Sequence, residues 1–125
     1  MNLIKSLGFA LEGLFEMGSN HNNFRLQIMI GLVVLTAGFF FRLNYSEWMI
    51  LILMSGLVLV AEMANSSIEA MVDLITKERK QEAKKAKDIA AGMVLLASGL
   101  SIVVGILVFG PYLLKFLAIQ PSQPF

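Results

Sequence analysis

The sequence predicts an all-α integral membrane protein, with an N-terminal amphipathic surface helix followed by three transmembrane helices. Of the 125 residues, 57% are apolar and only 15% are charged, a balance typical of membrane proteins and not of soluble domains. The apolar residues also gather in three long runs, while basic residues gather in one loop. A chain of this length forms one domain, residues 1–125. So thin a protomer is expected to oligomerise as a helical bundle.

Residues 2–18 are expected to form the surface helix. On a helical wheel one face is apolar and the other is polar, as in helices that lie in the membrane interface. The apolar face holds Leu3, Ile4, Leu7, Leu11, Leu14 and Phe15. The segment is too short and too charged to span a bilayer, and no A-x-A-type cleavage site follows it. Phe9 projects on the polar side, where it either packs against another helix or stacks on a nucleotide base.

The three membrane helices are expected at residues 25–42, 48–75 and 88–115. The first is an apolar run bounded by Arg25 and Arg42, whose side chains are expected to reach the two interfaces. The second begins at Trp48, stays apolar to Val60 and then becomes polar, which indicates one helix that continues out of the bilayer. The third is uncharged over a stretch long enough to span the bilayer by itself.

Basic residues determine the expected orientation. Residues 76–87 form a predicted loop that holds most of the lysines and arginines, whereas the loop between the first two spans holds only Arg42. Under the positive-inside rule the basic loop and the N-terminus face the cytoplasm, and the C-terminal tail faces outside. By default such a loop is a solvated segment near anionic headgroups. Because it shares a compartment with ATP, part of it is alternatively a nucleotide site.

The most informative feature is a polar stripe on the second membrane helix. Its members fall within an arc of about 100° at about 100° per residue; they are Glu62, Asn65, Ser66, Glu69 and Asp73. Counted from Trp48, Glu62 lies about 21 Å across a hydrocarbon layer of about 30 Å, and Glu69 lies at its cytoplasmic edge. A carboxylate at that depth is costly and indicates a functional site. The alternative is that Glu62 and Asn65 only form hydrogen bonds between helices.

Four further residues each have two interpretations. Lys87 and Asp88 open the third span, either as a snorkelling lysine with a helix N-cap or with Lys87 as a phosphate-binding lysine. His21 has no partner histidine, which favours an interfacial loop residue over a metal ligand. Arg25 precedes the first span, a position that favours an anchor to lipid headgroups over substrate recognition.

Motifs that the sequence lacks exclude several chemistries. It has no G-x-x-x-x-G-K-[ST], G-x-G-x-x-G, G-x-S-x-G or H-E-x-x-H pattern, so P-loop, protein-kinase, Rossmann, hydrolase and zincin interpretations have no basis. The absence of cysteine excludes disulfides, thiolate nucleophiles and cysteine-ligated metal. Any chemistry must be built from side chains on helices.

The polar stripe and the start of the third span resemble the small prokaryotic diacylglycerol kinase family, which includes the undecaprenol kinases. The motif reads Glu62-x-x-Asn65-[Ser/Thr]-x-Ile-Glu69-x-x-x-Asp73, then Lys87-Asp88-x-x-x-Gly92. The resemblance covers nearly the whole chain, since Lys5-Ser-Leu-Gly8-Phe9 is similar to the family's surface helix. It implies a homotrimer that transfers the γ-phosphoryl group of MgATP to a lipid hydroxyl at the cytoplasmic interface, at sites shared between subunits.

The resemblance also implies roles for individual residues. Glu62 matches the general base, and Arg25 and Gly92 are expected beside it around the lipid substrate. Glu69 matches a ligand of Mg²⁺. The supporting polar residues are Asn65, Ser66 and Asp73. The residues expected to bind ATP are Phe9, Glu69, Glu78, Arg79, Lys80, Lys87 and Asp88.

Two positions depart from the family pattern. His21 stands where the family has a second metal-binding glutamate, so the metal is held by His21, by Glu16 in its place, or mainly by Glu69 and the phosphates. Phe9 stands where tyrosine is frequent, which would keep base stacking and lose any hydroxyl contact.

We therefore expect a lipid kinase of the bacterial inner (plasma) membrane, with its N-terminus in the cytoplasm. Its partners would be MgATP and a membrane lipid, with no nucleic acid. Diacylglycerol is the expected substrate, and undecaprenol is the alternative because apolar grooves discriminate weakly between tails. A non-catalytic helical membrane oligomer is the alternative from another class. ATP consumption coupled to lipid phosphorylation would separate the enzyme from that oligomer.

Overall fold

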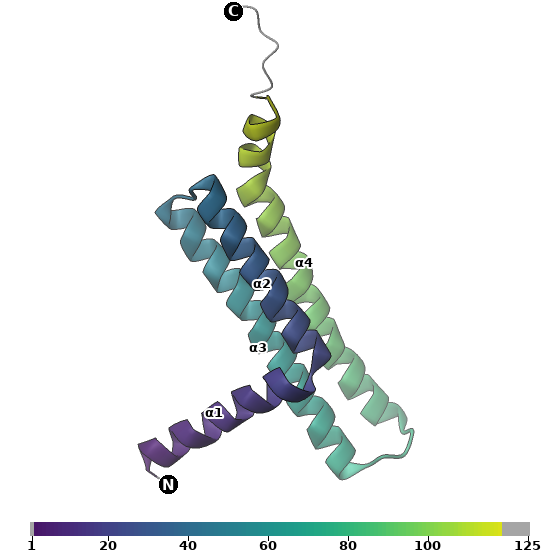
Figure 1. Ribbon diagram of the computed structural model, residues 1–125. Helices are drawn as coiled ribbons and strands as arrows, with labels where there is room; N and C mark the ends of the chain where they lie inside the picture. Colours follow the sequence, from purple (N-terminus) through teal and green to yellow (C-terminus); the bar gives the residue numbers. More distant parts are fainter. Residues whose placement is uncertain (1, 119–125) are drawn as a thin grey trace, which may run out of the picture.

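The computed structural model describes residues 2–118, and within them every regular element is an α-helix. The helices are α1 (Leu3–Asn20), α2 (Asn22–Phe41), α3 (Tyr45–Ile75) and α4 (Gln81–Ala118). In Figure 1, α2, α3 and α4 form a bundle, and α1 runs off at a steep angle from the start of α2. The predicted all-α fold is confirmed, and the predicted external tail lies outside the described residues.

Helix α1 is amphipathic and meets the rest of the molecule only near its end. Its first turn is capped by Asn2, whose side-chain oxygen accepts a hydrogen bond from the Lys5 N–H at 2.9 Å. The apolar residues Leu3 and Phe15 are 75% and 77% exposed, and Met17 is the buried residue of the helix. An exposed apolar face on a helix set across the bundle suits the membrane interface.

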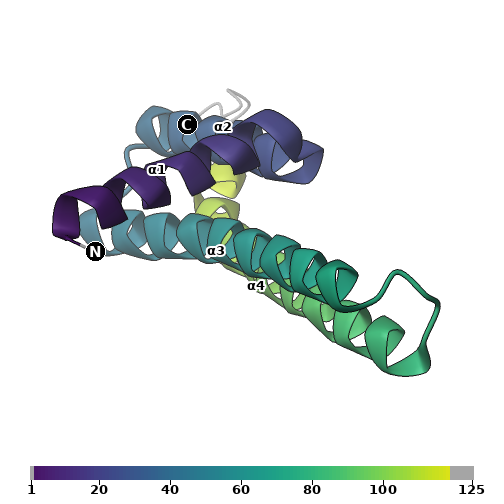
Figure 2. The same cartoon turned by 90° about the horizontal axis from the view of Figure 1, so that it is seen from below.

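Helices α2, α3 and α4 are each long and apolar enough to cross a membrane, with mean hydropathies of 1.9, 1.8 and 2.5. This agrees with the three predicted spans. A span needs about 20 residues, whereas α3 has 31 and α4 has 38. Both helices therefore extend beyond the bilayer, and Figures 1 and 2 show the α3–α4 hairpin continuing past α1 and α2.

The basic segment differs from the sequence-based expectation. Helix α4 begins at Gln81, so only residues 76–80 join it to α3, and most of the predicted loop 76–87 is helical. The reason is local, because the segment is rich in glutamine, glutamate, alanine and lysine, which favour helix, and contains no glycine or proline. Lys84 and Asp88 add an ion pair one turn apart at 2.5 Å.

The α2–α3 connection is a tight turn, and we call this end of the bundle the turn end. Arg42 ends α2 in the left-handed conformation, with φ 56°. Asn44 and Glu47 then form a capping box, in which each side chain accepts a hydrogen bond from the other residue's backbone N–H, at 2.9 and 3.1 Å. The cap explains why α3 begins at Tyr45, before the predicted residue 48.

The bundle core is small and divides into two clusters. The most extensive packing is between α3 and α4. One cluster, at the turn end, comprises Leu43, Leu51 and Val108; the other, nearer the opposite loop end, comprises Val58, Ala61 and Ala97. Most other apolar side chains of the described residues are exposed, so in a membrane they face lipid or other subunits.

Candidate functional site

Helix α3 positions the central carboxylate of the site. Glu62 is only 5% exposed and is the buried charged residue of the described chain. It lies one position after Ala61, so the core cluster of Val58, Ala61 and Ala97 adjoins it. The Glu62 side chain forms no hydrogen bond or ion pair with any described residue. A buried carboxylate without a partner is costly, and such groups mark functional sites.

Glu62 lines a small pocket of about 250 Å³, which we call the carboxylate pocket. One wall is the break between α1 and α2, and the other is the polar stripe of α3; together the lining residues are Asn20, His21, Asn22, Asn23, Glu62, Asn65, Ser66 and Glu69. Four of the five predicted stripe residues therefore meet in one cavity. The helical periodicity of α3 accounts for this, since they share a face.

His21 and Asn65 show how the two walls relate. The Nδ1 atom of His21 lies 3.4 Å from the Ser66 hydroxyl, which links the α1–α2 break to α3. The side-chain oxygen of Asn65 is buried and has no hydrogen-bond partner among the described residues. An orphaned buried acceptor of this kind is a candidate contact for a cation or a donor on a ligand.

The described residues of one protomer contain no group of three histidine, aspartate or glutamate side chains that could hold a metal ion. Glu16 is one of the candidates for the second metal ligand. Its side chain accepts a hydrogen bond from the Asn20 side chain at 2.8 Å and does not line the carboxylate pocket. The carboxylates that line the pocket are Glu62 and Glu69, and the orphaned Asn65 oxygen lies beside them.

A second cavity of about 800 Å³, the loop pocket, lies where α3 passes into α4. Six of the predicted residues line it: Asp73, Glu78, Arg79, Lys80, Lys87 and Asp88. Asp73 and Lys87 form an ion pair at 2.7 Å across the hairpin. Glu69 and Asp73 are one turn apart, about 6 Å along α3, so the two pockets follow each other on the same helix.

Three predicted site residues lie elsewhere. Phe9 is 57% exposed on α1 and lines neither pocket. Arg25 donates hydrogen bonds to the Ser19 carbonyl, at 3.1 Å, and to the Asn22 side chain. Its guanidinium therefore stabilises the C-terminal end of α1, where cations are favoured. Gly92 is on neither pocket wall, and a Cβ added to it would meet nothing within 4 Å.

Sequence reasoning missed the contribution of the α1–α2 break. Asn20, Asn22 and Asn23 line the carboxylate pocket beside His21. A signal was present, because asparagine favours helix termini and the run Asn20-His-Asn-Asn23 separates two helical patterns. The position of this run opposite Glu62 depends on how α1, α2 and α3 pack together, so it could not be predicted from the sequence.

Comparison with known proteins identifies the family of the chain. Residues 8–109 match the family model described as prokaryotic diacylglycerol kinase. The chain is 38% identical over 109 residues to the undecaprenol kinase of Bacillus subtilis, covering 87% of this chain and 89% of that protein. It is 36% identical over 117 residues to a diacylglycerol kinase of Synechocystis, covering 93% and 67%.

A third relative is a diacylglycerol kinase of Helicobacter pylori, 33% identical over 112 residues and covering 90% of this chain and 84% of that protein. The family match includes both pockets, all of α2 and α3, and α4 as far as residue 109. The chain therefore belongs to the prokaryotic diacylglycerol kinase family and is a membrane lipid kinase.

Proposed function

We propose that this enzyme transfers the γ-phosphoryl group of MgATP to the hydroxyl of diacylglycerol, with Glu62 as the general base. The observation that carries the proposal is the buried carboxylate of Glu62, unpaired within the described chain, on the wall of a polar pocket in a membrane helix. Undecaprenol is the second candidate substrate, favoured by the 38% identity to the undecaprenol kinase of Bacillus subtilis.

The chemistry assigns Glu62 one task. As the lipid oxygen forms its bond to the γ-phosphorus, the bond between that phosphorus and the oxygen of the leaving ADP breaks. The proton of the lipid hydroxyl passes to the Glu62 carboxylate, which has no competing partner among the described residues. Phosphoryl transfer depends mainly on positioning and charge neutralisation, so the remaining residues act by holding the two substrates.

The loop pocket is the proposed nucleotide site. Its volume of about 800 Å³ is within the usual range for small-molecule pockets. Arg79, Lys80 and Lys87 provide the positive charge that phosphates require. Lys87 is paired with Asp73, and we propose that a phosphate replaces this exposed partner. Asp88 completes the site from α4.

The carboxylate pocket suits a magnesium ion that arrives with ATP. Mg²⁺ in kinases is held by one or two carboxylates together with phosphate oxygens and waters. Glu69 and the orphaned Asn65 oxygen would provide the protein ligands, with His21 close by. The ion would neutralise charge on the phosphates as the transfer proceeds.

We further propose that the loop end faces the cytoplasm of a bacterial inner membrane and that the enzyme is a homotrimer. Because the native chain has no cysteine, single cysteines test the orientation cleanly. Gln81→Cys at the loop end should react with an impermeant thiol reagent only from the cytoplasmic side. Tyr45→Cys at the turn end, where the native side chain is 80% exposed, should react only from outside. Labelling of Gln81→Cys in intact cells would place the loop pocket away from ATP and overturn this orientation.

The activity is tested with purified protein, labelled ATP and each of the two lipids. Label should pass to diacylglycerol or to undecaprenol, with a higher kcat/KM for the true substrate. ATP hydrolysis without lipid phosphorylation, or no use of ATP at all, would refute the proposed reaction.

A further inference from the structure

The α1–α2 break consists of one residue, His21, and its geometry decides which side chains face Glu62. The His21 backbone is extended, with φ −120° and ψ 105°, and its N–H donates to the Met17 carbonyl at 3.2 Å. The buried residues Met17 and Phe24, 6% and 5% exposed, lie on either side of the break. Apolar packing anchors the break but is non-directional, so hydrogen bonds must orient its polar side chains.

The guanidinium of Arg25 forms the hydrogen bonds that cross the break. One nitrogen donates to the Ser19 carbonyl in the last turn of α1, at 3.1 Å, and the other donates to the side-chain oxygen of Asn22 in the first turn of α2. Among the side-chain hydrogen bonds of residues 2–118, the bond to Ser19 is the one that joins α1 to α2. Asn22 also lines the carboxylate pocket. Arg25 therefore ties the end of α1 to a residue of the pocket wall.

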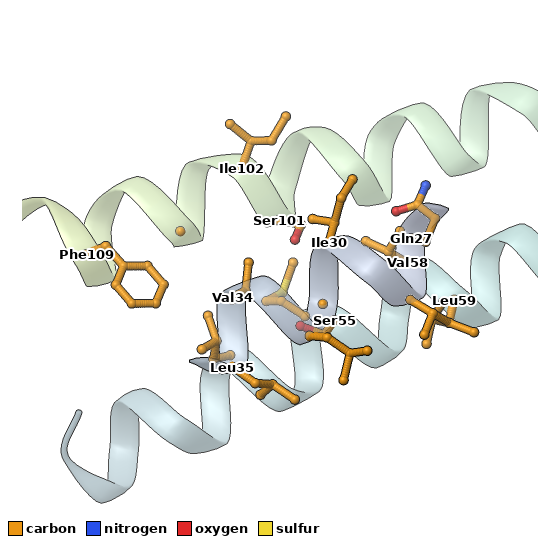
Figure 3. A pocket seen from close by; sticks show the side chains of 16 residues that line it. Gln27, Ile30, Val34, Leu35, Ser55, Val58, Leu59, Ser101, Ile102 and Phe109 are labelled. Carbon is orange, nitrogen blue, oxygen red and sulfur yellow. The ribbon is translucent and has the colours of Figure 1, made fainter. Parts of the chain in front are cut away.

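Arg25 itself is exposed and does not line the site. It is absent from the walls of the carboxylate pocket and of the loop pocket. It is also absent from the apolar groove between α2, α3 and α4, whose lining on α2 starts at Gln27 (Figure 3). Because both terminal nitrogens of its guanidinium already donate to the protein, Arg25 acts on the pocket through the residues that it holds.

We infer that Arg25 is a positioning residue for phosphoryl transfer, which holds the α1–α2 break so that residues 20–23 face Glu62. The inference rests on the proposed function. Residues 20–23 form one wall of the carboxylate pocket, and His21 is in contact with Ser66 on the other wall. Without the two bonds from Arg25, α1 can turn about His21 and the wall can move away from α3. Misplacement by about 1 Å at a reacting site can cost about 10² in rate.

Steady-state kinetics of the whole protein separate positioning from substrate binding. Arg25→Gln should lower kcat by about tenfold or more, while the KM for the lipid stays close to the wild-type value, as expected when only the transition state is affected. Arg25→Lys retains the charge but lacks the fork that reaches two acceptors, so its kcat should lie between the two. A raised KM for the lipid with an unchanged kcat would show that Arg25 binds the substrate directly, and would overturn the inference.

Arg42→Gln is the matched control, because Arg42 is the arginine at the other end of α2 and is exposed. Its side chain forms no hydrogen bond or ion pair with any described residue. This variant should have the wild-type kcat. An equal loss of kcat in Arg42→Gln would show that removing any arginine from α2 has the same effect, which would refute a specific role for Arg25.

A double-mutant cycle tests the route through Asn22. Asn22→Ala removes the side chain that Arg25 holds, so the loss of kcat in the double variant with Arg25→Gln should be clearly smaller than the product of the two single losses. Losses that simply multiply would mean that the two residues act independently, which contradicts the inference.

Disulfide formation measures the position of the break without any catalysis. The native chain has no cysteine, and the side chains of His21 and Ser66 lie 3.4 Å apart. In a variant with both His21→Cys and Ser66→Cys, loss of free thiols on oxidation should be several-fold slower when Arg25→Gln is added, because a disulfide needs a narrow range of Cα separations. Adding Arg42→Gln should leave the rate unchanged.

The two kinds of readout distinguish the inference from the proposed function. Equal rates of disulfide formation with and without Arg25→Gln would show that Arg25 does not hold the break, and would overturn the inference even if the enzyme phosphorylates lipid. If the wild-type protein phosphorylates neither diacylglycerol nor undecaprenol, the proposed function fails, and slower disulfide formation in Arg25→Gln would still establish the hold of Arg25 on the break.

Discussion

Helix α3 carries two glutamates in contrasting surroundings, Glu47 at the turn end and Glu62 in the second half of the helix, toward the loop end. Glu47, at the turn end, accepts hydrogen bonds from the Asn44 N–H and the Tyr112 hydroxyl. Glu62, toward the loop end, is more deeply buried and has no hydrogen-bond partner among the described residues. The same residue type on the same helix therefore has side-chain hydrogen bonds near the turn end and none toward the loop end.

The difference extends to the surroundings of each glutamate. At the turn end, aromatic rings surround the contact; Phe41 lies 6.0 Å from both Phe109 and Tyr112 between ring centroids. Around Glu62, polar side chains line an open pocket, and the Asn65 oxygen is orphaned. Satisfied polar groups and packed rings stabilise a structure. Unsatisfied buried groups are candidates for contact with a ligand, so we expect the turn end to have a structural role and the loop end to hold the site.

The comparison is tested most strongly by removing each carboxylate in turn. Glu62→Gln should lower turnover by about 10² or more, because an amide cannot accept the substrate proton. Glu47→Gln should retain turnover and lower the thermal unfolding midpoint. Both are measured on oligomeric protein of verified helicity. Near-normal turnover in Glu62→Gln would falsify its role as the base, and an equal loss in Glu47→Gln would remove the distinction between the two ends.

Substitutions toward the loop end, and not those at the turn end, should change how activity depends on Mg²⁺. Glu69→Gln should raise the Mg²⁺ concentration for half-maximal activity by about tenfold or more, the scale of changes around metal ligands. His21→Glu, which adds a carboxylate beside the pocket, should tighten that dependence or leave it unchanged. Glu47→Gln serves as the control with a wild-type titration. An unaltered Mg²⁺ titration for Glu69→Gln would rule out a ligand role.

Side chains at the turn end should be more closely packed than those toward the loop end. A Cβ on Gly38 would lie 2.7 Å from the Trp48 ring and 3.1 Å from the Leu43 side chain. Gly38→Ala should therefore lower the free energy of unfolding by about 1–3 kcal/mol through overpacking. Gly99→Ala has open space at its Cβ and should be neutral or slightly stabilising. Denaturation of both variants in one detergent checks this, and equal stabilities would contradict the packing difference.

The smallest expected effect concerns the hydrogen bond between the Tyr112 hydroxyl and Glu47. Tyr112→Phe keeps the ring and removes the hydroxyl, and Glu47 keeps its hydrogen bond from the Asn44 N–H, so the free energy of unfolding should fall by about 0.5–1.5 kcal/mol with no change in turnover. Tyr45→Phe is the matched control, because Tyr45 is 80% exposed and its hydroxyl forms no hydrogen bond with described residues. A loss of activity in Tyr112→Phe would show that the turn end affects catalysis.

Much of this arrangement follows from the sequence itself. The lengths of the apolar runs predict the membrane helices, and the spacing of Glu62, Asn65, Ser66 and Glu69 predicts that they share one helix face, which in the structure lines one pocket. These predictions succeed because each depends on the geometry of a single helix. The expected start of the third span at residue 88 is wrong, because lysine-rich segments favour helix and α4 begins at Gln81.

Only the tertiary structure decided which helices meet and at what depth. The contact of His21 with Ser66 joins residues 45 positions apart, and that of Tyr112 with Glu47 joins residues 65 apart. Arg25 donates a hydrogen bond to the Ser19 carbonyl at the end of α1, and Phe9 is exposed on α1 and lines neither pocket. Periodicity determines which residues share a face of one helix, but the register between helices depends on side-chain packing along their whole contact. The apolar groove between α2, α3 and α4 is a product of that register, because its three walls come from three different helices.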